Sequence, residues 1–116
     1  MDYYAGVHKI KTYLNELGFE VDLFSDQLPS DVLGRTYYVE RKVLLNCCSA
    51  REAFFTILHE AGHVLAYNKY FLRLKQKQPP PEKREVYAYL YGWIVNKQLE
   101  LGLTKEEWRS QELTSA

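Results

Sequence analysis

The sequence has no excess of charge of either sign, because fifteen lysines and arginines balance fifteen aspartates and glutamates. Basic and acidic residues are mixed along the chain, so the basic patch by which nucleic-acid binders neutralise phosphates is missing. No apolar run approaches the ~20 residues that span a bilayer. We therefore expect a protein that binds neither nucleic acid directly nor a membrane.

Signals for export and for a disulfide framework are also missing. The first residues, MDYYAGVHKIK, lack the charged-then-apolar order of a signal peptide, which predicts a cytoplasmic protein. The two cysteines, Cys47 and Cys48, are neighbours in the sequence. Neighbouring cysteines rarely pair with each other, so we expect two reduced thiols.

What the sequence does contain is enough apolar material for one core. The chain has 116 residues, of which 47% are hydrophobic, and we expect a single domain over residues 1–116. Capping boxes at Ser49–Glu52 and Thr104–Glu107 mark two helix starts. Helices following strands predict an α+β fold, with a small antiparallel three-stranded sheet packed on helices. In chain order we expect a helix over 3–17 ended by Gly18, a strand over 19–24, a hairpin over 35–46 turning at Glu40 and Arg41, and helices over 49–67, over 82–101 ended by Gly102, and from 104 through Trp108.

The stretch TILHEAGHVLAY, residues 56–67, places two histidines one helical turn apart. On a helical wheel His59 and His63 are separated by about 40°, so both imidazoles can reach one ion. Most of this helix is apolar, which predicts burial, and its single polar arc must then face polar groups. A metal in a water-filled cleft fits this requirement. Two hydrogen-bonded histidines and a salt-bridged Glu60 are the structural alternative.

A catalytic zinc site needs a third protein ligand and an open position for water. No histidine follows His63, and His8 is expected on the surface. We predict Glu85 as the third ligand, because Ala88 and Gly92 share its helix face and allow the two helices to approach closely. An unpaired carboxylate on such a contact face would be costly, whereas a metal-bound one would not.

The residues alone also allow another role for Glu85 and other candidates for the third ligand. Glu85 could instead be an exposed acid of the first helical turn, favoured by the helix dipole. Cys47 or Cys48 could supply a thiolate in its place. Two other acids are less well placed, since Glu82 lies beside the proline connector and Glu100 lies at the far end of the helix.

These residues resemble the ImmA/IrrE family of metallopeptidases over about residues 19–94. The resemblance rests on the strand FEVDLF, the hairpin ending VLLN, and the segments FTILHEAGHVLAY and KREVYAYLYGWIV. It implies a minimal zincin-like metallopeptidase domain in which His59, His63 and Glu85 bind the metal and Glu60 is the general base. The sequence departs from the family where GWIVNKQLELG replaces a segment similar to Leu-Leu-Met-Pro. Members often occur in phages and mobile elements, which implies a transcriptional repressor as one protein substrate.

The expected activity is that of a zinc metalloprotease, a hydrolase that cleaves a peptide bond with Glu60 as the proton acceptor. Zinc is the default metal by ligand type, and Mn²⁺ or Fe²⁺ accepts the same ligands. The hairpin offers an edge strand to which an extended substrate can add, and its Tyr37 and Tyr38 could equally belong to the core. The alternatives are a metal-containing binding module that acts on a regulator without cleavage, and a helical interaction protein without metal. The tyrosines considered as oxyanion partners are Tyr67, Tyr87, Tyr89 and Tyr91.

Overall fold

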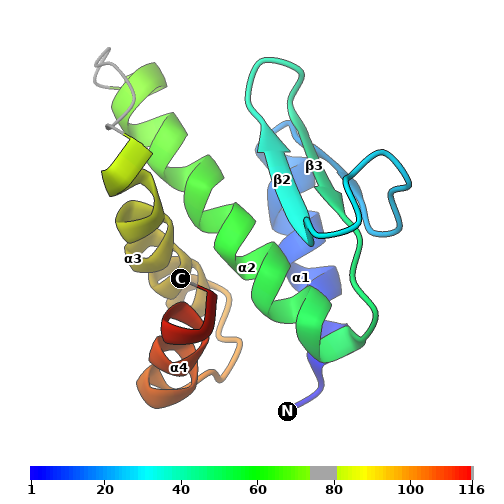
Figure 1. Ribbon diagram of the computed structural model, residues 1–116. Coiled ribbons are helices and arrows are strands. Elements are labelled where there is room, and N and C mark those ends of the chain that lie inside the picture. Colours follow the sequence, from blue (N-terminus) through cyan, green and yellow to red (C-terminus); the bar gives the residue numbers. More distant parts are fainter. Residues whose placement is uncertain (74–80, 116) are drawn as a thin grey trace.

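A computed structural model describes residues 1–73 and 81–115 of the chain (Figure 1). It confirms the α+β class, and α2 crosses the molecule with the sheet and α1 on one side and α3 and α4 on the other. Within the described residues, no helix is both long and apolar enough to cross a membrane. The elements in chain order are α1 (Tyr3–Glu16), β1 (Glu20–Asp22), β2 (Gly34–Tyr37), β3 (Lys42–Leu45), α2 (Ala50–Tyr67), the π-helical η1 (Asn68–Arg73), α3 (Pro81–Gln98) and α4 (Lys105–Ser115).

The helix ends predicted from local signals agree with the structure for α1 and α2. Gly18 ends α1 with a φ of 88°, the left-handed conformation that glycine adopts without strain. At the start of α2, the Ser49 hydroxyl accepts a hydrogen bond from the Glu52 N–H at 3.1 Å. The Glu52 carboxylate in turn accepts one from the Cys48 N–H at 2.9 Å. The capping box is therefore present, although its reciprocal bond reaches Cys48 rather than Ser49.

The predicted end of α3 at Gly102 was wrong. The helix ends at Gln98, and Glu100 takes the left-handed conformation with a φ of 53°. The Leu101 N–H then donates to the Asn96 carbonyl at 3.1 Å, as in a Schellman motif. The Asn96 side chain also bonds to both backbone groups of Leu103, at 3.2 and 3.3 Å, which fixes the turn in this position.

The last helix, α4, begins at the predicted capping box but continues past Trp108 to Ser115. The Thr104 hydroxyl accepts from the Glu107 N–H at 3.2 Å, and the Glu107 carboxylate accepts from the Thr104 N–H at 3.1 Å. Beyond Trp108 the helix has no apolar repeat, so its length could not be predicted from periodicity.

The sheet is mixed, so the prediction of an entirely antiparallel sheet was wrong. The strand order is β1-β3-β2, and β2 and β3 form the expected antiparallel hairpin. β1, however, pairs in parallel with β3, with Glu20 opposite Lys42. Alternation along β1 indicates that one face is more buried than the other, but it carries no information on the direction of pairing. The residues between β1 and β2 carry the chain past β3, so β2 becomes an edge strand.

Candidate metal centre

Both histidines of the motif lie on α2 and turn toward α3. Their ring centroids are 4.8 Å apart, and their side chains are 29% exposed at His59 and 13% exposed at His63. The rest of α2 packs into the core, with Phe54, Ile57 and Leu58 fully buried. The burial expected from the apolar pattern is therefore confirmed, and the histidines are held by a rigid helix at the margin of that core.

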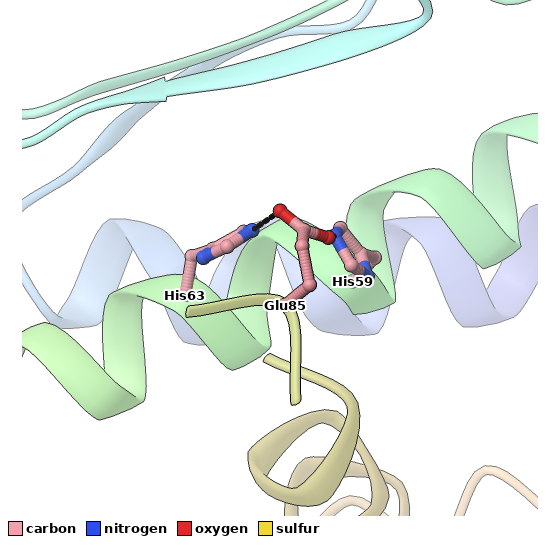
Figure 2. A group of neighbouring side chains, drawn as sticks. All are labelled: His59, His63 and Glu85. Atoms are coloured by element: carbon pink, nitrogen blue, oxygen red, sulfur yellow. Dashed lines mark ion pairs between the residues drawn. The ribbon is translucent and has the colours of Figure 1, made fainter. Parts of the chain in front are cut away.

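Glu85, on α3, completes a group of three side chains that could hold a metal ion (Figure 2). Its Oε2 lies 2.8 Å from His59 Nε2 and its Oε1 lies 3.3 Å from His63 Nε2. One ligand atom from each residue lies within 4.8 Å of the other two. Two imidazole nitrogens and a carboxylate oxygen form a donor set that can bind a divalent metal ion.

The close packing of α2 on α3 brings Glu85 to the histidines. A Cβ at Gly62 would overlap the Ala88 carbonyl oxygen and lie 2.9 Å from the Gly92 nitrogen, so the two helix backbones are in close contact. The predicted close approach through small residues is therefore confirmed. Glu85 itself lies at the edge of this contact, with its side chain 69% exposed, as in the alternative of an exposed acid. What stabilises its carboxylate is pairing with both imidazoles.

Hydrogen bonds from His59 and then His63 hold the pKa of Glu85 well below its usual range. The Glu85 carboxylate is therefore ionised at neutral and mildly acidic pH. Protons then compete with a metal ion at the imidazoles of His59 and His63 and not at Glu85. Only the neutral imidazole ring binds a metal, so a protonated histidine must first release its proton. We expect metal affinity to fall as the pH is lowered, by up to about a hundredfold per pH unit once both rings must release a proton to bind the ion.

This pH dependence can be measured with a chromophoric zinc competitor between pH 5 and 8. The His63→Ala variant is the control, because loss of one of the two histidine ligands should reduce the slope by about half. An affinity that did not change over this pH range would show that the histidines do not bind the metal.

Glu60, the second residue of the motif, lies between α2 and β2 and is only 6% exposed. The Thr36 hydroxyl donates a hydrogen bond to its Oε1 at 2.8 Å. Its Oε2 faces Gly34, where a Cβ would lie 3.5 Å away. Among the residues that the structure describes, no ion pair involves Glu60, so the salt bridge considered as an alternative is not formed there.

A cleft of about 1090 Å³ runs along the polar arc of α2 and contains the histidines, Glu60 and Glu85. Edge strand β2 forms one wall, and α3 and α4 form the other. The cleft therefore provides the polar environment that was predicted for the polar arc of α2. Thr36 was not singled out from the sequence, because a lone threonine in a short strand carries no motif signal.

Of the four tyrosines considered as oxyanion partners, Tyr89 lines the cleft, and a fifth tyrosine, Tyr38, lines it as well. Tyr87 instead packs against Tyr70, at 5.1 Å between ring centroids, and against Tyr91, at 6.4 Å. Tyr67 stacks on Tyr38, with ring centroids 4.6 Å apart.

Tyr38, the residue that follows β2, is therefore a cleft residue as well as a packing residue. Burial, followed by the nearby Glu60 carboxylate, raises the pKa of Tyr38 to about 12; Arg84 opposes this rise and Glu85 adds to it. The phenol keeps its proton at neutral pH and can donate a hydrogen bond.

The other candidate ligands lie apart from this group. The Cys47 thiol donates to the Leu33 carbonyl at 3.5 Å, and burial raises its pKa, which disfavours the thiolate that a metal needs. Cys48 is exposed and outside the group, Glu100 lies beyond the opposite end of α3, and the side chain of Glu82 lies outside the described residues. His8 is exposed, as expected, and packs edge-on against Tyr4.

Comparison with known proteins adds no match to the chain, whether among family models, curated proteins or solved structures. The resemblance to the ImmA/IrrE family therefore rests on the motif residues, and the activity that it implies is a proposal.

Proposed function

We propose that this chain is a zinc-dependent metallo-endopeptidase that hydrolyses a peptide bond in a specific protein substrate. The observation that carries the proposal is the meeting of His59, His63 and Glu85 in a cleft that also contains Glu60. A structural metal site needs no open position and no neighbouring carboxylate that is free of the metal. Both are features of a hydrolytic site.

The metal ligands, Glu60 and the cleft tyrosines would have separate roles in this hydrolysis. His59, His63 and Glu85 would hold the zinc ion, which would supply Lewis acidity to the scissile carbonyl and lower the pKa of a bound water toward ~7. Glu60 accepts a proton from the attacking water and passes it to the leaving amine. The neutral phenol of Tyr38 is the candidate donor to the developing oxyanion, with Tyr89 as the second candidate.

Edge strand β2 supplies a surface for an extended substrate. The Asn46 N–H donates to the Leu33 carbonyl at 2.8 Å, so Leu33 is a hydrogen-bonded position of the antiparallel pair. Such positions alternate, which directs the main-chain groups of Gly34 and Thr36 away from β3. A substrate segment can add to these free groups as a further strand, and its middle then crosses the cleft. This mode of binding favours an endopeptidase that takes an unfolded or extended segment.

The metal and the substrate follow from the site chemistry and the family resemblance respectively. Two imidazoles and one carboxylate favour zinc, and Mn²⁺ or Fe²⁺ is compatible with the same set. The resemblance to the ImmA/IrrE family suggests a phage or mobile-element repressor as the substrate. A repressor with an exposed, extended linker would present the kind of segment that β2 can bind.

The test is elemental analysis of the purified chain beside His63→Ala and Glu85→Ala. We expect about one zinc per wild-type chain and loss of the zinc in each variant, because two ligands hold zinc far less tightly than three. Glu106→Ala, an acid in the first turn of α4, is the matched control and should keep its zinc. No zinc in the wild type after zinc is supplied would contradict the proposal. Zinc retained in Glu85→Ala alone would contradict the assignment of the third ligand.

A further inference from the structure

Thr36 is the residue that joins the edge strand to the proposed general base. It lies in β2 opposite Val43 and is half-buried, with its side chain directed toward α2. Its hydroxyl donates to Glu60 Oε1 at 2.8 Å, which is the side-chain hydrogen bond described for that carboxylate. A hydrogen bond to an ionised group is among the stronger ones in proteins, so this contact restricts how the carboxylate can rotate.

The surroundings of the two Glu60 oxygens differ. Oε1 is occupied by Thr36, whereas Oε2 faces Gly34, which has no side chain to cover it. A Cβ at Gly34 would lie 2.6 Å from the Thr56 methyl group and 3.5 Å from Oε2. Glycine therefore allows β2 to lie close to α2 and places no side chain against Oε2 of Glu60.

We propose that Thr36 is a positioning residue, which holds Glu60 through Oε1 so that Oε2 faces the cleft. The inference rests on the proposed function, because it concerns the orientation of the general base. The same residue directs its main-chain groups to the open edge of the sheet, where a substrate strand would add. Strand β2, to which the substrate would add, would thus also fix the Glu60 carboxylate that accepts the proton from water.

The test compares Thr36→Val with Thr36→Ser in the zinc-loaded full chain. Valine matches threonine in shape and favours strands, so it removes the hydroxyl and keeps β2. The probe is a library of internally quenched peptides, and constants are taken from one peptide that the wild type cleaves. We expect Thr36→Val to lower kcat roughly ten- to a hundredfold, as for loss of a hydrogen bond to a charged group, with KM unchanged. Thr36→Ser should restore most of kcat.

A second measurement does not depend on activity. Crystal structures of the metal-free wild type and of Thr36→Val should show a fixed Glu60 carboxylate in the first and a rotated or multiply placed one in the second. Zinc content should be equal in all three proteins. If valine destabilises the fold, Thr36→Ala replaces it, because the smaller side chain leaves room for water.

The outcomes separate the two proposals. An unchanged kcat in Thr36→Val, a change in KM alone, or an unmoved Glu60 carboxylate would overturn the role of Thr36 and leave the peptidase intact. A different result would count against the proposed function: the zinc-loaded wild type shows no peptide cleavage that is lost when Glu60 is replaced. The position of the Glu60 carboxylate in the metal-free variant then still decides whether Thr36 holds it.

Discussion

Replacing Glu60 with Gln is expected to leave the zinc content unchanged and to lower the hydrolytic rate by at least about a hundredfold, the lower range for loss of a general base. Glutamine has the shape of glutamate, and its amide oxygen can still accept the hydrogen bond from Thr36. The histidines and Glu85 are untouched, so the metal site should remain. An amide has no proton affinity at neutral pH, so it cannot take the proton from water.

The matched control is Glu52→Gln, on the same helix and on the wall of the same cleft. Glu52 serves the capping box, and glutamine serves equally well at that position. We expect near wild-type rates from this variant on the same quenched peptides. Equal rates in Glu60→Gln and wild type would show that Glu60 is not the base. A binding module predicts a third result. Neither the wild type nor Glu60→Gln would cleave a peptide, and Glu60→Gln would keep the effect of the wild type on the regulator.

The parts of the fold that could be predicted from the sequence are those fixed by neighbours along the chain. Gly18 ends α1 because a left-handed residue is needed there, and Ser49 starts α2 because its hydroxyl reaches an unpaired N–H. The pairing of His59 with His63 follows from helical spacing alone. Predicting Glu85 needed one further inference, namely that small residues on its helix face imply a close partner helix. The contact of Gly62 with Ala88 and Gly92 confirms this inference.

The parts that could not be predicted depend on how distant segments meet. The direction of β1 is set by its pairing with β3, and alternation is the same for both directions. Thr36 and Tyr38 reach the cleft because β2 lies over the polar arc of α2, a fact that no local pattern in β2 encodes. Glu100 was missed as the end of α3 because glutamate rarely adopts a positive φ, and the Asn96 bonds to Leu103 that fix the turn are tertiary contacts.

Replacing Gly62 with Ala is expected to destabilise the domain by about 1–3 kcal/mol, the range for overpacked cores, and to weaken zinc binding about tenfold or more. Helix propensity alone predicts the opposite sign, since alanine is favoured over glycine inside a helix by about 1 kcal/mol. The sign of the change therefore reports on the packing of α2 against α3. The new methyl group would meet the Ala88 carbonyl and the Gly92 nitrogen, which are backbone atoms that no rotamer change can move.

Thermal unfolding and zinc titration of Gly62→Ala should be compared with those of Gly6→Ala, a second glycine at a helix contact. A Cβ at Gly6 would lie 2.6 Å from the ring of Phe54, on the side of α2 that packs against α1. Both variants should unfold at lower temperature, but Gly6→Ala should bind zinc normally because Glu85 does not move. In Gly62→Ala, α3 must shift near Ala88, one turn from Glu85, so the carboxylate leaves the histidines. Normal stability and normal zinc affinity in Gly62→Ala would mean that the two helices do not lie this close. The third ligand would then have to reach His59 and His63 by another path.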